Sequence, residues 1–241
     1  MRLAPSLHRV GSDLVNTYLV EDSGGVTVID AGLPGHWKDL LAELATMGRS
    51  LGDIRGVVLT HGDSDHIGFA ERLRRETGAP VYVHELDAAR ARGEDRSNGS
   101  WGRVRPGPLV RFLWYGARHG GLRIPPVTEV VTLPEGGPLD LPGSPVIIPV
   151  PGHTPGSVAI HVPTVDALFV GDALTTGHVL TGRQGPQPAP FTLEPELALE
   201  SVDKLGAVQA SWLLPGHGAP WRGAIGDALG ELKEAAASTS R

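Results

Sequence analysis

The stretch His61-Gly62-Asp63-Ser64-Asp65-His66 directly follows the apolar run Val57-Val58-Leu59-Thr60, and it is the most informative part of this chain. The apolar run is typical of a buried strand, and a loop that leaves a strand end can turn alternate side chains into one pocket. His61, Asp63 and Asp65 could therefore converge. Imidazole and carboxylate groups are the usual protein ligands of zinc, iron and manganese. The stretch thus predicts a metal site at the end of a strand.

Three later segments repeat this pattern, because each follows a short apolar run and carries one histidine or aspartate in a glycine-bearing turn. They are Pro151-Gly152-His153-Thr154-Pro155-Gly156, Gly171-Asp172-Ala173 and Pro215-Gly216-His217-Gly218. Loops at strand ends that are brought together by a sheet hold a polar site rigidly. We therefore expect the four segments to meet in one site.

The distribution of apolar residues predicts strands with helices interspersed. Residues 15–20 and 25–29 are expected to form a hairpin, and helices are expected over residues 67–76, 109–118, 194–205 and 225–236. Strands that occur early and again in the middle of the chain fit two packed sheets with helices outside. Because no linker divides the sequence, a single domain over residues 1–241 is expected.

The order of the four motifs resembles that of the metallo-β-lactamase superfamily of hydrolases, over about residues 16–221. The resemblance implies an α+β fold, namely an αββα sandwich of two mixed β-sheets flanked by helices. Within the superfamily, the chain is most similar to the branch of glyoxalase II and the lactonases. The commoner first motif of the family has histidine at the position that Asp63 occupies here.

The resemblance also implies a role for each ligand. His61, Asp63 and His153 would hold one metal ion, Asp65, His66 and His217 would hold a second, and Asp172 would bridge the two. Two divalent ions, with zinc as the expected metal, can activate a shared water as the nucleophile. In that mechanism Asp65 would also orient the water and pass a proton to the leaving group.

Two carboxylates leave alternatives open. Asp63 is a harder and more anionic ligand than histidine, so it lowers the positive charge of the centre and favours iron or manganese. The flavodiiron branch of the superfamily has a carboxylate here and binds two irons. Asp30 either holds a ligand imidazole in place or serves only as a turn residue before Gly32.

The arginine-rich segment, residues 90–126, differs in charge from the rest of the chain. It has eight arginines and two acids, hence +6, and since the whole chain has a formal charge of -6 the remainder carries -12. Insertions at this point roof the active site in the resembled family. We expect a lid-like insertion, with most of its arginines on the surface and one or two receiving an anionic group of the substrate. The candidate substrate-binding residues are Trp114, Tyr115, Arg118 and His119, with His178 and Arg183 on a second wall.

The bulk composition excludes several classes. The chain has no cysteine, which excludes disulfides and thiolate metal sites. Its start lacks the apolar core of a signal peptide, and no stretch approaches the roughly 18 apolar residues of a membrane span, so we expect a cytoplasmic protein with no membrane partner. The formal charge of -6 argues against nucleic acid as a partner. A small-molecule substrate and a homodimer are further expectations.

The sequence therefore predicts a dinuclear metallohydrolase that uses a metal-bound hydroxide to cleave an ester, thioester, lactone or related acyl bond in a small anionic metabolite. Three alternatives stay open. One is a phosphodiesterase, and another is a mononuclear non-haem iron oxygenase that resembles the persulfide dioxygenases. The third is a metal-free binding protein on the same fold.

Overall fold

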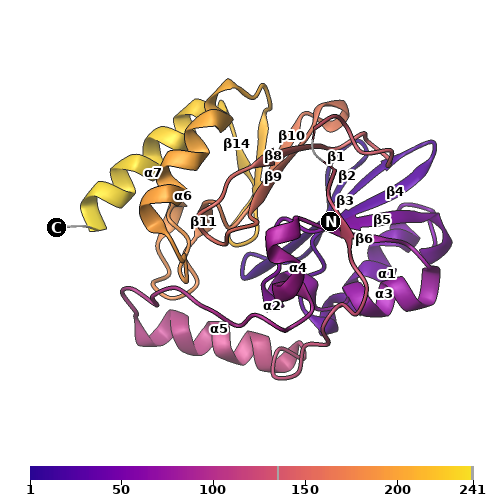
Figure 1. Ribbon diagram of the computed structural model, residues 1–241, viewed down its shortest axis with the longest axis horizontal. Coiled ribbons are helices and arrows are strands. Elements are labelled where there is room, and N and C mark those ends of the chain that lie inside the picture. Colours follow the sequence, from indigo (N-terminus) through magenta and orange to yellow (C-terminus); the bar gives the residue numbers. More distant parts are fainter. Residues whose placement is uncertain (135, 240–241) are drawn as a thin grey trace.

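The computed structural model describes residues 1–134 and 136–239, and over these residues two large β-sheets face each other (Figure 1). The first sheet has the order β1-β2-β3-β4-β5-β6-β7. Its strands are β1 (Arg2–Ala4), β2 (Leu7–Ser12), β3 (Val15–Asp22), β4 (Gly25–Ile29), β5 (Ile54–Val58), β6 (Val81–Val83) and β7 (Val131–Thr132). β1 to β4 pair antiparallel, and β4 to β7 pair parallel, so the sheet is mixed.

The second sheet has the order β14-β13-β10-β9-β8 and is also mixed, since β10 and β13 are parallel and the other pairs are antiparallel. Its strands are β8 (Val146–Pro149), β9 (Val158–Val162), β10 (Ala167–Gly171), β13 (Trp212–Pro215) and β14 (Trp221–Arg222). A separate two-stranded ribbon consists of β11 (Thr175–Gly177) and β12 (Gln184–Gln187).

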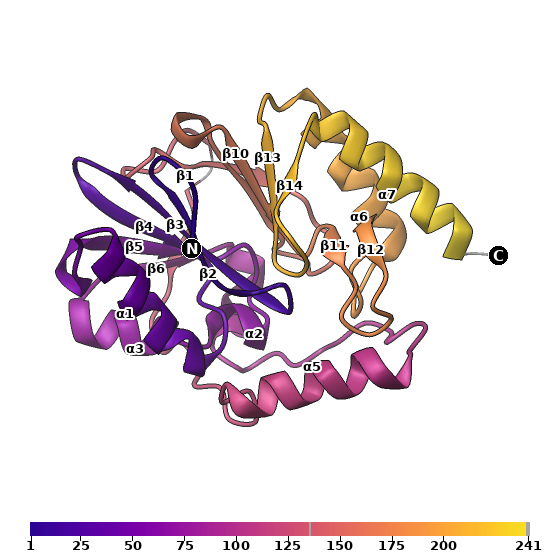
Figure 2. The same cartoon turned by 180° about the vertical axis from the view of Figure 1, so that it is seen from behind.

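Helices cover the outer faces of the two sheets (Figures 1 and 2). The α-helices are α1 (Trp37–Thr46), α2 (Ser64–Ile67), α3 (Ala70–Thr77), α4 (Ala88–Ala91), α5 (Pro106–Arg118), α6 (Pro195–Ser201) and α7 (Ile225–Thr239). Short 3-10 helices span Pro34–His36, Leu51–Asp53, Glu85–Asp87, Pro163–Val165 and Val202–Ala207. α1 and α3 lie outside the first sheet, and α6 and α7 lie outside the second. The predicted αββα sandwich is confirmed.

The alternation of side chains along the strands explains why three apolar layers form. In β4, Val28 packs in the cluster with Leu40 of α1, whereas its neighbour Ile29 packs in the cluster between the sheets with Phe169 of β10. Successive residues of a strand point to opposite faces, so a continuous apolar run feeds both layers. A third cluster joins the second sheet to α7, for example through Leu229. In the described part of the chain, no helix is long and apolar enough to cross a membrane.

The helices differ from the sequence expectation in several places, and α7 extends to Thr239 rather than ending at residue 236. α5 begins at Pro106 rather than at residue 109, because proline is favoured in the first turn, where its missing N–H is not needed. The helix expected over residues 194–205 becomes α6 followed by a 3-10 helix. The helix expected over residues 67–76 is divided into α2 and α3, and the division lies at Gly68.

Gly68 divides the helix because the backbone of the first sheet approaches it closely. The N–H of Gly68 donates to Gly32 O at 2.7 Å, and the N–H of Phe69 donates to Ala31 O at 3.0 Å. These bonds attach α2, which carries His66, to the end of β4. A Cβ atom at position 68 would lie 2.3 Å from Gly32 O and 2.5 Å from Leu33 Cα. The site therefore requires a residue without a side chain.

We expect Gly68→Ala to destabilise the fold by about 2 kcal/mol or more, since the obstructing atoms belong to backbone that cannot move aside. Urea unfolding would measure the loss. The matched control is Gly226→Ala in α7, where a Cβ meets nothing within 4 Å. Alanine there should stabilise the helix by up to about 1 kcal/mol. Equal stability of the two variants would show that the approach to Gly32 imposes no constraint.

Candidate metal centre

The seven predicted ligands meet at one edge of the sandwich, between the two sheets. The first sheet supplies four of them from the segment between β5 and α3, and the second supplies three from the ends of its strands. Their donor atoms form groups whose members all lie within 4.8 Å of one another, namely His61 with Asp63 and His153, Asp65 with His66 and His217, and His61 with His66 and Asp172. The first two groups are the two ligand sets that the resemblance implies. We call the seven side chains the ligand cluster.

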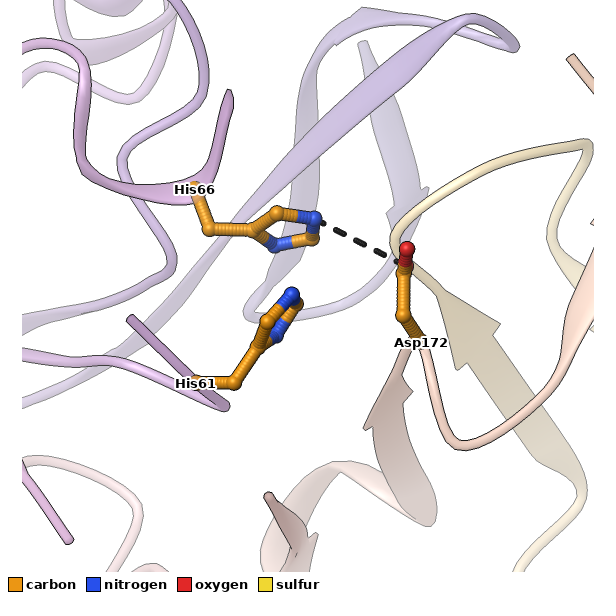
Figure 3. Close-up of side chains that lie close together, drawn as sticks. All are labelled: His61, His66 and Asp172. Carbon is orange, nitrogen blue, oxygen red and sulfur yellow. Dashed lines mark ion pairs between the residues drawn. The ribbon is translucent and has the colours of Figure 1, made fainter. Parts of the chain in front are cut away.

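Asp172 lies between the two sets, at the position of a bridging ligand. Its Oδ1 is 3.6 Å from His66 Nε2, and its Oδ2 is 3.2 Å from His217 Nε2 and 3.8 Å from His153 Nε2. Figure 3 shows the rings of His61 and His66 side by side, with the Asp172 carboxylate facing the His66 ring from the opposite sheet. Gly216 makes room for this contact, because a Cβ there would lie 2.4 Å from Asp172 Oδ1 and 2.5 Å from His66 Cε1.

All four histidines present the same ring nitrogen to the centre. The Nδ1 atoms of His61, His66, His153 and His217 contact Thr60 Oγ1, Asp30 Oδ2, Thr192 Oγ1 and Leu14 O, respectively. The Nε2 atoms are thereby left to the centre. Of these, His61 Nε2 and His66 Nε2 are buried and have no hydrogen-bond partner among the described residues, and the same holds for Asp172 Oδ1.

Buried donors and acceptors without partners are rare, because each costs about 1–3 kcal/mol. Their convergence here fits a group that accepts electron pairs from nitrogen and oxygen, which is a metal ion. The donor set of imidazoles and carboxylates suits a divalent cation.

Asp30 orients two of the imidazoles. Its Oδ2 accepts a hydrogen bond from His66 Nδ1 at 2.9 Å and another from Thr60 Oγ1 at 2.8 Å, and its Oδ1 accepts from the Thr60 N–H. Because the hydroxyl of Thr60 donates to Asp30, it is free to accept from His61 Nδ1 at 3.0 Å. The structure therefore favours the first of the two interpretations of Asp30. The relay through Thr60 was missed in the sequence, where this residue has no motif context.

The charges of the cluster shift the pKa values of its members strongly. Burial alone would lower the pKa of His66, but Asp30 and Asp172 outweigh it and raise the pKa to about 10. Burial would likewise lower the pKa of His217, but Asp172 and Asp65 outweigh burial and raise this pKa to about 9. Three carboxylates thus favour a positive charge on His66 and His217. A bound cation would take the place of these protons, because imidazole binds a metal ion in its neutral form.

Asp87 is a structural residue that the sequence analysis did not identify. It is fully buried and holds two ligand loops together. Its Oδ2 accepts from the Gly62 N–H at 2.8 Å and from Thr154 Oγ1 at 2.7 Å, and its Oδ1 accepts from the Gly156 N–H at 2.8 Å. No motif marks this residue, because its partners lie 25 to 69 positions away along the chain.

Asp63 has an unexpected partner, Arg90. The Arg90 side chain is buried, and its Nη1 donates to Asp63 Oδ1 at 2.8 Å. In the sequence, Arg90 is part of the arginine-rich segment, in which most arginines were expected on the surface. The structure instead places it beside the ligand cluster, at the position where the chain departs from the commoner motif.

A cleft of about 900 Å³ leads to the ligand cluster. Its floor includes Asp63, Asp65, His153, Asp172 and His217, and its wall is largely apolar. The apolar residues of the wall include Trp101, Phe112, Leu113, Leu122, Ile124 and Phe191. α5, from the arginine-rich segment, runs across the open edge of the sandwich below α2 (Figures 1 and 2). Arg96 and Arg123 also line the cleft, and among the described residues neither has an ion-pair partner.

Four candidate substrate-binding residues on α5 and at its end do not line this cleft, and the helical period is the reason. Phe112, Leu113, Gly116 and Ala117 line it instead. Trp114 and Arg118 are four residues apart and exposed on another face, where the guanidinium lies 4.9 Å from the ring centre. On this helix the aromatic and aliphatic side chains that line the cleft are therefore Phe112 and Leu113, in place of the candidates Trp114 and Tyr115.

Tyr115 and His119 attach α5 to the body of the protein. Tyr115 Oη contacts Nε2 of the buried His36 at 2.7 Å, and the His119 carbonyl accepts from the Gly35 N–H at 2.8 Å. Of the two candidates on the second wall, His178 lines a separate, smaller cavity with Leu14 and Arg111. Arg183 is exposed and donates to Ser238 Oγ.

The family model described as the metallo-β-lactamase superfamily matches residues 10–217, which is most of the chain. The chain belongs to this superfamily. Its members are generally hydrolases, and they usually bind divalent metal ions.

Three relatives illustrate this membership. The Bacillus subtilis protein "Probable metallo-hydrolase YflN" is 29% identical over 91% of this chain and 86% of its own length. The Bos taurus "Acyl-coenzyme A thioesterase MBLAC2" is 28% identical over 84% of this chain and 72% of its own length. Among solved structures, TTHA1623 in a di-iron-bound form superposes with a TM-score of 0.62 at 29% identity, covering 89% of this chain and 93% of its own.

Asp30→Asn should weaken metal binding about 10- to 100-fold, the usual effect of losing the group that orients a ligand imidazole. Asparagine tolerates the left-handed backbone at this position, where φ is 58°, so the fold should persist. Chelator competition would measure the affinity. Asp203→Asn is the control, because Asp203 is paired with Lys233 at the surface. Unchanged affinity in Asp30→Asn would contradict the assigned role.

His36 gives a pH prediction for the attachment of α5. Burial, aided by nearby His119, lowers the pKa of His36 from 6.5 to about 4. As the pH falls, the unfolded chain therefore takes up this proton at a higher pH than the folded protein does. The contribution of neutral His36 to the free energy of unfolding is complete above pH 6.5 and is lost as the pH falls toward 4. Urea unfolding at pH 7 and 4.5 should show that His36→Gln, which does not titrate, loses less stability than the wild type. The difference should be up to about 3 kcal/mol, and equal losses would show that His36 is not held neutral.

Proposed function

We propose that this protein is a dinuclear metallohydrolase and that the ligand cluster holds its two divalent ions. The observation that supports this most directly is that three buried atoms at the centre have no hydrogen-bond partner among the described residues, namely His61 Nε2, His66 Nε2 and Asp172 Oδ1. A purely structural polar cluster would satisfy these atoms among its own members. Loss of the ions should therefore leave three unpaired polar atoms in the core.

Two divalent ions at this position would lower the pKa of a shared water toward neutrality and polarise the substrate carbonyl. The residues of the chain supply the remaining functions. Asp65 belongs to the cluster and also lines the cleft, with its Oδ2 3.4 Å from His217 Nε2. It is placed to take a proton from the attacking water and deliver it to the leaving group.

The cleft supports an amphipathic, anionic acyl compound as the substrate. Its apolar wall would bury an acyl group and exclude water, while Arg96 and Arg123 would receive a carboxylate or phosphate of the carrier. We propose ester, thioester or lactone cleavage, with an acyl thioester as the first class to test. The thioesterase named among the relatives supports this choice.

Zinc is the metal proposed from the resemblance, and iron is the strongest alternative. The di-iron form of TTHA1623 supports iron, and so do the three carboxylate oxygens of this centre. A small-molecule substrate, a cytoplasmic location, a homodimer, and the absence of nucleic-acid and membrane partners stay predictions of the sequence.

The deciding experiment is elemental analysis of protein purified without added metal, followed by assays with thioesters, lactones and phosphodiesters. We expect about two divalent ions per chain and acyl hydrolysis that chelators abolish. One iron per chain with oxygen consumption would replace the proposal by the oxygenase alternative. Intact protein that binds no metal after reloading would refute catalysis at this centre.

Arg96→Met and Arg123→Met test the anionic end of the substrate. Each variant should raise KM for a thioester with an anionic carrier about tenfold, with kcat nearly unchanged, because the arginine contacts the carrier and not the reacting carbonyl. Neutral short esters should be unaffected. Arg118→Met is the matched control, since Arg118 stacks on Trp114 outside the cleft. An equal change in Arg118→Met would indicate a general charge effect instead.

A further inference from the structure

Arg90 is buried in a position that requires a structural explanation. It lies near the end of α4, only 6% of it is exposed, and its Nε has no hydrogen-bond partner. Its Nη2 donates to the carbonyl and hydroxyl oxygens of Ser97, and its Nη1 donates to Asp63 Oδ1. A buried guanidinium is costly unless an anion compensates it. Asp63 is the carboxylate at 2.8 Å, whereas Asp95 lies 4.0 Å away.

The two carboxylate oxygens of Asp63 have different partners. Oδ1 accepts from Arg90, whereas Oδ2 faces the cluster, 3.3 Å from His153 Nε2 and 3.7 Å from His61 Nε2. One oxygen is therefore available to a cation. A carboxylate held in this way would bind a cation through Oδ2 alone, and the planar guanidinium orients it from the opposite side.

The contact also changes the charge that the cluster presents. Taken together, Asp63 and Arg90 carry no net charge, so the pair presents one donor atom and zero charge, as a neutral imidazole does. This result alters the expectation from sequence that a third carboxylate makes the centre less positive. The extra negative charge of Asp63 is offset within 2.8 Å.

We propose that Arg90 is a positioning residue that makes Asp63 a monodentate, charge-compensated ligand, so that the pair acts as the equivalent of one neutral histidine. The inference rests on the proposed metal centre. The competing explanation is that Arg90 only holds the loop at Ser97, with no influence on the cluster. The two explanations differ in what happens when the carboxylate charge is removed while the guanidinium stays.

Asp63→Asn tests the inference with a nearly isosteric ligand. The variant removes the anion nearest to the Arg90 cation and leaves only Asp95, 4.0 Å away, so metal content should fall from about two to about one per chain. Affinity at the first site should fall at least tenfold. The double variant Asp63→Asn with Arg90→Met should then regain at least tenfold in affinity, because the repelling charge is gone. Elemental analysis and chelator competition provide both readouts without an activity assay.

Two further double variants identify charge as the cause. The double variant Asp63→Asn with Arg90→Lys keeps the positive charge at position 90, so it should not regain metal. If steric crowding by Arg90 were the cause of the lost affinity, the smaller lysine head group would restore metal binding. Asp63→Asn with Arg92→Met should not regain metal either, since Arg92 is paired with Glu94. If Arg90→Met prevents folding, Arg90→Gln gives the same comparison and can still donate to Ser97.

In the single variant Arg90→Met, both oxygens of Asp63 become free to bind. The visible spectrum of the cobalt-substituted protein should change toward higher coordination at one site, and an unchanged spectrum would overturn the monodentate assignment. Two ions bound at wild-type affinity in Asp63→Asn would overturn the charge pairing alone. A wild-type protein that binds no metal would instead refute the proposed function.

Discussion

The hydrogen bonds of the Asp30 carboxylate are the interactions on which the arrangement of the ligand cluster depends most. The Asp30 backbone has a φ of 58°, a left-handed conformation that aspartate tolerates better than most residues. In this conformation the buried side chain turns back from the end of β4 to the end of β5. There it accepts the N–H and hydroxyl of Thr60 and the Nδ1–H of His66. Two neighbouring strand ends and two ligand imidazoles are therefore fixed by one charged group.

The ligand cluster is also where the two sheets meet, which links metal binding to the stability of the fold. His61, Asp63, Asp65 and His66 follow β5 of the first sheet, and His153, Asp172 and His217 follow β8, β10 and β13 of the second. Cations bound by both sets would cross-link the sheets in the folded state only, and such binding free energy adds to the free energy of unfolding. The buried donor atoms without protein partners cost stability, and the cations would offset this cost. The ligand cluster would therefore lower the free energy of unfolding by itself, and bound cations would raise it.

Local signals in the sequence predicted the hairpin, the two packed sheets and the four ligand-bearing segments, because each depends on short apolar runs followed by turns. The αββα sandwich and the set of seven ligands were instead implied by the resemblance to the superfamily. The residues that hold the ligands could not be predicted in this way. Asp87 joins loops that are far apart in the chain, and only the folded backbone brings Gly62 and Gly156 to it. Thr60 has a role only because Asp30 reaches it from the neighbouring strand. Contacts of this kind are set by strand order, which no motif encodes.

The arginine-rich segment shows why charge composition predicts less than contacts do. A net charge of +6 suggested that most arginines of the segment lie on the surface and that one or two receive an anionic group, but it did not indicate which. Arg90 is buried against Asp63, Arg92 pairs with Glu94, Arg118 stacks on Trp114, and Arg96 and Arg123 line the cleft. Electrostatic interactions weaken with distance and solvent exposure, so only the nearest charges determine the properties of a ligand. At Asp63 the nearest charge is Arg90, so this contact affects the charge around Asp63 more than the number of carboxylates in the motif does.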